Sequence, residues 1–316
     1  MISIGIDIGG TFVKFFAVND RKKILKTDKI PTYTTLSGKA FLGQLSRIVN
    51  EWRGGFKDKD VVLGVGIAGD TDPEKGVLRW APNIPWHNLK VSKVMKENTG
   101  CDCYVSNDAN MAAWGVFDRE FKGKYKNMII VTLGTGIGGG IIIDGKLYQG
   151  ADGSSGELGH MKIDYSPDAP LCGCGQRGCM ESYAGTKGIL RMAQAVSAEN
   201  PKSILANLIN TEDFSVSLLS QAAEQGDEVA LNLWKEIGSY LGRGLADMVL
   251  LLNPHAIVLA GGVSRGAKYF LPSIREVFDR QAVKTPFKNV KILLSKEGNI
   301  GGVGAALYAL HKANEK

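Results

Sequence analysis

The chain has 316 residues, of which 44% are hydrophobic and 22% are charged, the composition of an ordinary globular protein that is long enough for two lobes. Its formal net charge of +6 is spread along the chain, which argues against a nucleic-acid-binding face and fits an anionic substrate. No apolar run approaches the ~20 residues of a membrane span, and no basic leader precedes the first apolar segment, so a cytoplasmic protein is expected.

Two segments share one pattern, an apolar strand, a glycine turn that carries a threonine, and a second strand. They occupy residues 1–20 (MISIGIDIGGTFVKFFAVND) and 128–145 (MIIVTLGTGIGGGIIIDG). Further strands are expected over 61–68, 102–106, 256–262 and 290–295. Helices are expected over 39–52, 88–99, 109–120, 185–198, 216–225, 227–252, 268–280 and 301–313. This alternation predicts an α/β protein of two related lobes.

The two glycine turns read DIGGT (7–11) and GTGIGGG (134–140), and each offers backbone N–H groups and a threonine hydroxyl to an anion. Gly134, Gly136 and Gly139 also fit a dinucleotide-binding pattern. That pattern must open a helix, whereas a β-branched run follows here, so a nicotinamide enzyme is rejected. The matched turns favour a clamp around a polyphosphate, and two ordinary hairpin turns are the alternative.

Two charged side chains flank the first turn. Asp7 lies near the end of an apolar strand, where burying a charged carboxylate costs free energy unless it binds a partner. A hydrated Mg²⁺ held beside phosphates would be such a partner, because this cation binds few carboxylates and keeps its waters. Lys14 would neutralise phosphate charge, unless it is simply an exposed strand lysine.

A polar cluster separates the strand expected over 102–106 from the helix that follows. It contains Asn107, Asp108 and Asn110, and helix capping accounts for only one of them. Ligands of open α/β sheets bind at the carboxyl ends of strands. An aspartate placed there, Asp108, can accept a hydroxyl proton during phosphoryl transfer.

Three of the five cysteines fall within LCGCGQRGCMES (171–182). An odd number of cysteines in a reducing compartment disfavours disulfides. Cys172, Cys174 and Cys179 are separated by glycines that allow sharp turns, and His160 is the nearest histidine before them. A Cys3His set is typical of structural zinc and leaves no open position. A structural Zn²⁺ is therefore expected, with free cysteines or a redox pair as the alternative.

Taken together, these motifs resemble the ROK family of sugar kinases and repressors, within the actin and hexokinase superfamily. The resemblance covers nearly the whole chain and rests on DIGGT (7–11), NDAN (107–110), GTGIGGG (134–140), GELGH (156–160), CGCGQRGCME (172–181) and NPHAIVLAGG (253–262). It implies a two-lobed actin/hexokinase-like (ribonuclease H-like) α/β fold with a structural zinc loop. One lobe would comprise residues 1–118 and 300–316, and the other residues 119–299.

The resemblance further implies phosphorylation of a hexose hydroxyl by ATP and Mg²⁺, with Asp108 as the general base. The sugar would be bound by Asn83, Asn107, Asp108, Glu157, His160 and Glu181. The phosphates would meet Gly9, Gly10, Thr11 and Lys14 from one lobe and Gly134, Thr135 and Gly136 from the other. Gly261 and Gly262 would lie against the adenosine. The zinc ligands would be His160, Cys172, Cys174 and Cys179, so that loss of the metal damages sugar binding and spares the phosphate turns.

Within the family, GELGHM (156–161) and CGCGQRGCMESYAG (172–185) look most like the glucokinase branch. The alternatives are an N-acetylglucosamine or N-acetylmannosamine kinase, a fructokinase, and a sugar-sensing protein without turnover. Repressor members carry an added N-terminal DNA-binding domain, for which this chain leaves no room before its first strand, so no nucleic-acid partner is expected. The resemblance leaves open ADP or polyphosphate as donor, and it implies a homodimer or homotetramer. GIAGDTD (66–72) departs from the family's frequent Gly-x-Pro-Gly.

Overall fold

A computed structural model describes residues 1–56, 59–209, 215–297 and 300–315. The chain divides into two compact units. Unit 1 comprises Met1–Lys126, Gly140–Gly156 and Glu297–Lys316, and unit 2 comprises Asn127–Gly139 and Glu157–Lys296. Residues 119–126 and 140–156 thus group with unit 1, whereas the expected boundaries assign them to the second lobe. The assignment of functional lobes stays a prediction.

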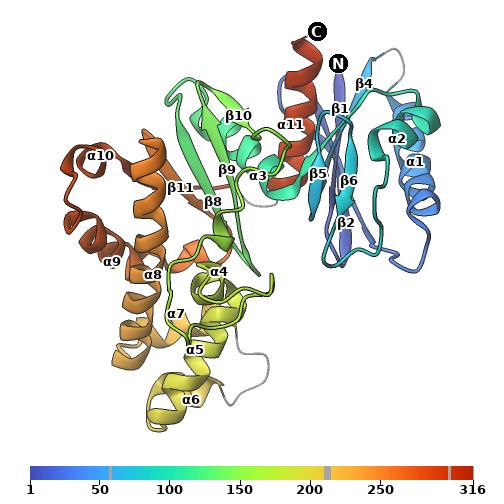
Figure 1. Cartoon of the computed structure of the whole chain (residues 1–316). Helices are drawn as coiled ribbons and strands as arrows, with labels where there is room; N and C mark the ends of the chain where they lie inside the picture. Colours follow the sequence, from blue (N-terminus) through green and yellow to red (C-terminus); the bar gives the residue numbers. More distant parts are fainter. Residues whose placement is uncertain (57–58, 210–214, 298–299, 316) are drawn as a thin grey trace. The chain divides into compact units, whose positions relative to one another are not determined.

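Unit 1 is built on a five-stranded sheet in the order β3-β2-β1-β4-β7 (Figure 1). Its strands are β1 (Ile2–Ile8), β2 (Phe12–Asn19), β3 (Ile24–Pro31), β4 (Val61–Ile67) and β7 (Cys103–Asn107). β1 runs antiparallel to β2 and parallel to β4, and β4 runs parallel to β7. A small antiparallel pair, β5 (Asp70–Asp72) and β6 (Val77–Trp80), follows β4. The edge strand β3 is almost wholly exposed and lacks apolar alternation, which explains why the sequence does not predict it.

The helices of unit 1 are α1 (Gly38–Gly55), α2 (Val91–Thr99), α3 (Asp108–Val116), which continues as a π-helical turn (Phe117–Phe121), and α11 (Ile300–Asn314). One face of β1 buries isoleucines at alternate positions against Phe41 and Leu45 of α1. The other face meets α11, which lies beside α3 in Figure 1. A Cβ on Gly5 or Gly64 would lie 1.9 Å from a carbonyl oxygen of α11, so glycine is required for this close approach.

The second sheet has the order β10-β9-β8-β11-β12. Its strands are β8 (Met128–Leu133), β9 (Ile137–Ile143), β10 (Lys146–Tyr148), β11 (Ala256–Ala260) and β12 (Lys291–Leu294). The boundary between the units falls within β9, whose last residues belong to unit 1 and pair there with β10. β8, β11 and β12 lie in unit 2, and β11 runs parallel to both of its neighbours.

The helices of unit 2 are α4 (Glu181–Ala184), α5 (Thr186–Glu199), α6 (Ile204–Ile209), α7 (Val216–Glu224), α8 (Glu228–Leu252), α9 (Ala267–Asp279) and α10 (Lys284–Asn289), with 3-10 turns at Leu158–His160 and Val263–Gly266. Asp227 begins α8 by accepting a hydrogen bond from the backbone N–H of Val229 (2.8 Å). Asn253 ends it in the left-handed conformation. Trp234 and Ile237 of this helix are fully buried in a core shared with β8 and β11.

The expected α/β class is confirmed, and every strand and helix predicted from periodicity is present within a few residues of its expected bounds. The helix expected over 109–120 is α3 followed by the π-helical turn. Within the described ranges, no helix combines the length and apolar character that crossing a lipid bilayer requires.

Candidate active site and metal cluster

Three parallel strands of unit 1 end at one edge of its sheet. The register pairs Ile8 of β1 with Ile67 of β4, and Ile67 with Asn107 of β7. The first glycine turn (Gly9–Thr11) and the Asn107–Asp108 pair therefore leave the sheet at the same edge. This edge is where ligands bind in open α/β sheets.

The first turn is held in place by Thr32. The Thr32 hydroxyl donates to the carbonyl of Gly9 (2.7 Å), and its backbone N–H donates to the carbonyl of Thr11 (2.9 Å). Gly10 and Thr11 are exposed. A Cβ on Gly10 would lie 3.0 Å from the Cβ of Asn83, so a residue expected to bind sugar lies against a turn expected to bind phosphate.

Asp7 and Lys14 face each other across the paired strands that flank this turn. Burial raises the pKa of the Asp7 carboxyl, and the charge of Lys14 acts in the opposite direction without cancelling the effect. The start of α11 also approaches closely, because a Cβ on Gly301 would lie 3.0 Å from Oδ2 of Asp7. The carboxylate of Asp7, close to the exposed first glycine turn, has the oxygen ligands that a hard cation such as Mg²⁺ accepts.

Asn107 caps α3, as the capping alternative predicts. Its Oδ1 accepts from the N–H groups of Ala109 (2.8 Å) and Asn110 (3.3 Å), and its Nδ2 donates to the carbonyl of Gly69 (3.1 Å). Asp108 is half-buried at the first position of the helix, and its Oδ1 accepts from Ala109 (2.9 Å). These bonds fix both side chains at the carboxyl end of β7.

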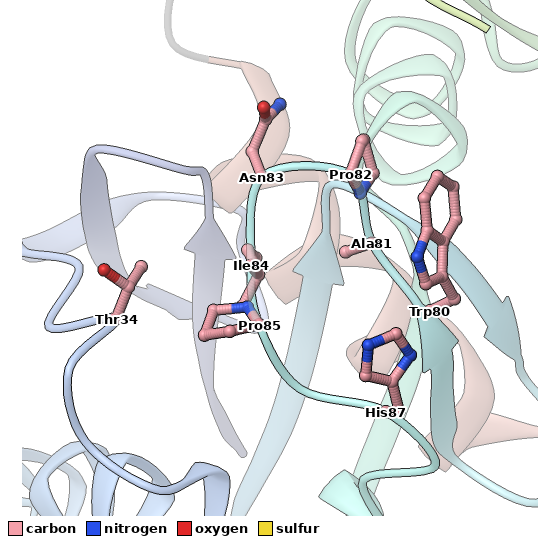
Figure 2. Close-up of a pocket in the computed structure, with 8 residues that line it drawn as sticks. All are labelled: Thr34, Trp80, Ala81, Pro82, Asn83, Ile84, Pro85 and His87. Carbon is pink, nitrogen blue, oxygen red and sulfur yellow. The ribbon is translucent and has the colours of Figure 1, made fainter. Parts of the chain in front are cut away.

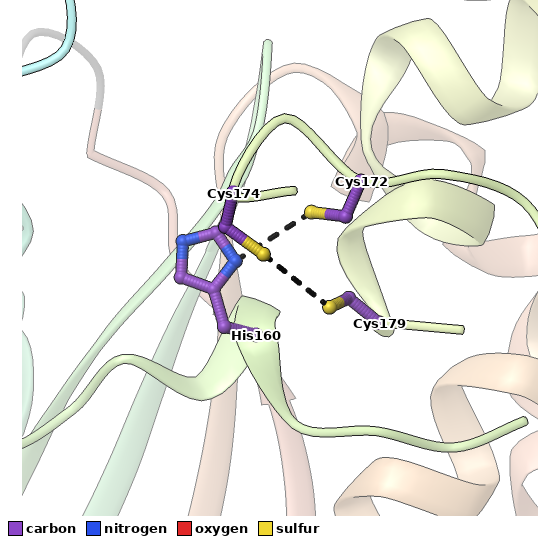
Figure 3. A group of neighbouring side chains, drawn as sticks. All are labelled: His160, Cys172, Cys174 and Cys179. Carbon is purple, nitrogen blue, oxygen red and sulfur yellow. Dashed lines mark hydrogen bonds between the residues drawn. The ribbon is translucent and has the colours of Figure 1, made fainter. Parts of the chain in front are cut away.

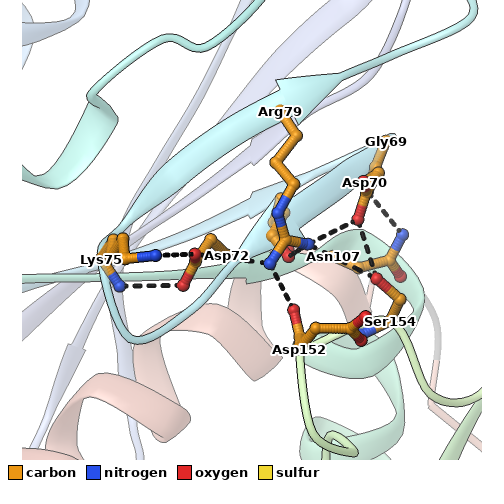
Figure 4. A network of polar contacts seen from close by, with 9 residues as sticks. Gly69, Asp70, Asp72, Lys75, Arg79, Asn107, Asp152 and Ser154 are labelled. Carbon is orange, nitrogen blue, oxygen red and sulfur yellow. Dashed lines mark hydrogen bonds and ion pairs between the residues drawn. The ribbon is translucent and has the colours of Figure 1, made fainter.

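An arginine that the sequence did not single out organises the neighbouring segment (Figure 4). Arg79 of β6 donates to Oδ1 of Asp70 (2.9 Å) and to the carbonyl of Asp152 (2.5 Å), and lies 3.4 Å from Oδ2 of Asp72. The Ser154 hydroxyl donates to the same Oδ1 of Asp70 (2.9 Å). Two carboxylates at alternate positions of one strand share a face and need a cation, and this alternation is the signal that could have found Arg79.

An open pocket of about 560 Å³ lies beside Asn83 (Figure 2). It is lined by Thr34, Trp80, Ala81, Pro82, Asn83, Ile84, Pro85 and His87. Half of the Trp80 surface (51%) is exposed.

The expected metal ligands converge in unit 2 (Figure 3). One donor atom from each of His160, Cys172, Cys174 and Cys179 lies within 4.8 Å of all the others. The Cys172 Sγ–His160 Nδ1 distance is 3.6 Å, and the Cys174 Sγ–Cys179 Sγ distance is 3.7 Å. Zinc–sulfur bonds of ~2.3 Å in a tetrahedron give sulfur–sulfur edges of ~3.8 Å, so these donors fit the ion.

The thiols of this cluster differ in acidity. Burial raises the pKa of Cys172 to about 12 and also raises the pKa of Cys179. At Cys174 burial acts in the same direction, but hydrogen bonds from the Gln176 backbone and the other thiols outweigh it and lower the pKa. Metal binding requires thiolates, so a cation would have to supply the charge that stabilises Cys172 and Cys179 in that form.

The second glycine turn is held by residues that follow the cysteines. The hydroxyl and backbone N–H of Thr186 both donate to the carbonyl of Gly134 (2.7 and 3.0 Å). The N–H of Ile137 donates to Oε2 of Glu181 (2.8 Å), and Oε1 of Glu181 lies 3.7 Å from Sγ of Cys172. No local sequence pattern predicts the role of Thr186.

The expected adenosine residues lie at the same edge of the second sheet as this turn. Ala260 of β11 pairs with Thr132 of β8, and Gly261 follows with a φ of 95°. A Cβ there would lie 2.4 Å from the carbonyl oxygen of Leu133, so the position demands glycine. Gly262 directly precedes the 3-10 turn Val263–Gly266.

Each predicted site residue therefore has a defined place in one unit. Unit 1 holds Asp7, Gly9, Gly10, Thr11, Lys14, Asn83, Asn107 and Asp108, and unit 2 holds Gly134, Thr135, Gly136, Glu157, His160, Cys172, Cys174, Cys179, Glu181, Gly261 and Gly262. In unit 2, Glu157 is exposed, and its Oε2 lies 3.9 Å from Nε2 of His160. The roles of all these predicted residues in binding sugar and nucleotide stay predictions.

Comparison with known proteins decides the family, because residues 3–312 match the ROK family. The chain belongs to the ROK family. The glucokinase of Streptomyces coelicolor is 36% identical over 311 residues, which cover 96% of each chain. The crystal structure of a ROK family glucokinase from Streptomyces griseus, in complex with glucose and AMPPNP, is 33% identical with a TM-score of 0.79 and covers 98% of this chain and 100% of that one.

The family also includes regulators. The xylose repressor of Caldicellulosiruptor bescii is 31% identical over 234 residues, which cover 74% of this chain and 58% of the repressor. The structural match confirms the expected actin/hexokinase-like fold of ROK sugar kinases, with a cysteine–histidine cluster compatible with zinc.

Proposed function

We propose that this ROK protein is an ATP-dependent hexose kinase that converts glucose and ATP to glucose 6-phosphate and ADP. The observation that carries the proposal is the sheet edge in unit 1, where the first glycine turn follows β1 and Asp108 follows β7, two parallel strands that both pair with β4. The similarity to glucokinases over nearly the whole chain supports glucose as the hexose.

In this proposal Asp108 is the general base. It accepts the proton of a sugar hydroxyl as that oxygen attacks the terminal phosphoryl group, whose bond to ADP breaks. The hydrogen bond that the backbone N–H of Ala109 donates to Oδ1 of Asp108 holds the carboxylate in a fixed orientation at the start of α3. A positioned base of this kind contributes about 10²–10⁴-fold to the rate.

The two glycine turns bind the phosphates through backbone N–H groups, aided by the charge of Lys14. Asp7 would hold Mg²⁺, which when bound neutralises phosphate charge. Gly261 and Gly262 approach the adenosine, since neither has a side chain to block it. Phosphoryl transfer needs little covalent help, so positioning and charge neutralisation account for most of the catalysis.

Sugar recognition is assigned to Asn83, Asn107, Glu157, His160 and Glu181. A site built to bond particular hydroxyls rejects epimers, because its buried polar groups are then left unpaired. Nδ1 of His160 faces Cys172 while its Nε2 faces Glu157, so one nitrogen can bind metal while the other meets a hydroxyl. Zn²⁺ on the four ligands would be structural, because no coordination position remains open.

The test is ADP formation by the purified protein with glucose, mannose, fructose, N-acetylglucosamine and N-acetylmannosamine, with ATP or polyphosphate as donor. We expect a strong preference for glucose with ATP. Preference for an N-acyl sugar would refute glucose as the substrate but would leave the proposed mechanism unchanged. If no sugar is phosphorylated with either donor, the kinase assignment is wrong and a sugar-sensing protein is favoured. The similarity to a xylose repressor suggests that class.

A further inference from the structure

The turn Gly134–Ile137 depends on a support from outside its own hairpin. Glycine-rich backbone has more conformational freedom than any other, so a turn of this kind needs external contacts to keep its N–H groups in one direction. In unit 2 these contacts come from a short segment, Glu181–Thr186, that starts two residues after the cysteine ligand Cys179.

Glu181 provides the contact nearest to the turn's centre. Its Oε2 accepts from the N–H of Ile137 at 2.8 Å, a hydrogen bond to a charged acceptor and therefore stronger than a neutral one. A Cβ on Gly136 would lie only 2.2 Å from this same oxygen. The absence of a side chain at position 136 is thus what lets the carboxylate reach the backbone.

The other oxygen of Glu181 faces the metal cluster. Oε1 lies 3.7 Å from Sγ of Cys172, while Cys179 is bound into the start of α4 through the Ser182 N–H (3.0 Å) and hydroxyl (2.6 Å), which both donate to its carbonyl. One carboxylate therefore touches a cysteine of the cluster and the turn assigned to phosphate. The expectation that the metal loop serves the sugar alone does not account for this contact.

We propose that Glu181 is a positioning residue for the phosphate turn, so that the segment carrying the metal ligands sets the affinity for nucleotide as well as for sugar. The inference rests on the proposed kinase function. It adds a connection within unit 2, from the cysteine–histidine cluster through Glu181 to Ile137.

Calorimetric titration of AMPPNP with Mg²⁺ into sugar-free protein tests the connection, because no sugar contact contributes to that measurement. We expect Glu181→Ala to raise the Kd for AMPPNP about tenfold, the effect of losing one charge-assisted hydrogen bond. Glu181→Gln keeps a carbonyl oxygen that can accept from Ile137, so its Kd should rise less than about threefold. Glu224→Ala, which removes an exposed carboxylate on α7, is the matched control and should leave the Kd unchanged.

Thr186→Val supplies an independent test, because Thr186 supports the same turn and has no assigned role in sugar binding. It should weaken AMPPNP binding and leave glucose binding unchanged. It also keeps the inference testable if Glu181→Ala fails to fold. Hydrogen exchange provides a readout without any ligand, since the Ile137 amide should exchange faster in Glu181→Ala and after chelation of the metal.

Wild-type affinity for AMPPNP in folded Glu181→Ala, with glucose affinity lost, would overturn the inference and leave Glu181 as a sugar ligand alone. Unchanged AMPPNP affinity in Thr186→Val, together with unchanged Ile137 exchange after chelation, would also contradict it. Failure of the wild-type protein to bind AMPPNP would instead refute the proposed kinase function, and the inference would fall with it.

Discussion

The two glycine turns look alike in sequence, and the structure supports them in partly different ways. In each, a threonine hydroxyl from a later segment donates to the carbonyl of the first glycine at 2.7 Å: Thr32 to Gly9 and Thr186 to Gly134. Beside the first turn lies a half-buried carboxylate, Asp7, opposite a lysine. The second turn receives a carboxylate from the segment that follows the metal cluster. The same local motif therefore lies beside a carboxylate–lysine pair in one unit and is tied to a cysteine cluster in the other.

The largest expected effect belongs to neither turn. Asp108→Asn removes the proposed general base and should lower kcat about 10²–10⁴-fold, while the Kd values for glucose and AMPPNP change little. Steady-state kinetics together with calorimetry separates the two effects. Full turnover in this variant would refute the proposed role of Asp108 as the general base.

Loss of the metal should affect the two turns unequally. Cys174→Ser removes one of four ligands, and we expect the purified variant to lose most of its zinc and to bind glucose more weakly. Metal content by mass spectrometry and peptide hydrogen exchange provide the measurements. Exchange should speed up around Gly134–Ile137 and stay unchanged around Gly9–Thr11. Equal changes in both turns, or a metal-free wild type with full affinity for glucose, would contradict the account.

Alanine at one glycine of each turn compares what an added methyl group meets there. Gly136→Ala would place a methyl group 2.2 Å from Oε2 of Glu181, which must move away and release Ile137, so AMPPNP binding should weaken about tenfold. Gly9→Ala meets only the carbonyl oxygen of Phe12 at 3.3 Å, and its effect should stay below about threefold. If Gly9→Ala raises the Kd for AMPPNP more than Gly136→Ala does, the carboxylate contact does not hold the second turn.

The smallest expected effect concerns stability and pH. Because burial raises the folded-state pKa of Asp7 above its unfolded value, the folded chain binds this proton more tightly, and stability falls as pH rises between the two values. Asp7→Asn should therefore raise Tm by a few degrees at neutral pH in metal-free buffer, and the gain should vanish below the unfolded pKa. Thermal melts of both proteins across pH 3–8 measure this, and a lower Tm for Asp7→Asn at neutral pH would contradict it.

Sequence reasoning succeeded where the information is local. The apolar alternation of β1, the helical pattern over 227–252 and the spacing of three cysteines each lie within a continuous segment, and the structure contains all three features. The α/β alternation and the rule that ligands bind at the carboxyl ends of strands also pointed to Asn107 and Asp108, whereas the register that aligns Ile8, Ile67 and Asn107 comes from the structure.

Contacts between distant residues were beyond such reasoning. Thr32 and Gly9 are 23 positions apart, and Thr186 and Gly134 are 52 apart, so no periodicity relates them. Arg79 contacts Asp70 nearby but also Asp152, 73 positions away. A threonine or arginine in a loop fits many environments equally well, and only the folded backbone selects which carbonyl it meets.

The central claim, that this chain transfers phosphate from ATP to a hexose, is tested most directly by identifying the product. Mass spectrometry of a reaction with glucose, ATP and Mg²⁺ should show glucose 6-phosphate and ADP in equal amounts for the wild-type protein, and at least about a hundredfold less of both in the same time for Asp108→Asn. ADP without a sugar phosphate, or equal product from both proteins, would contradict the account.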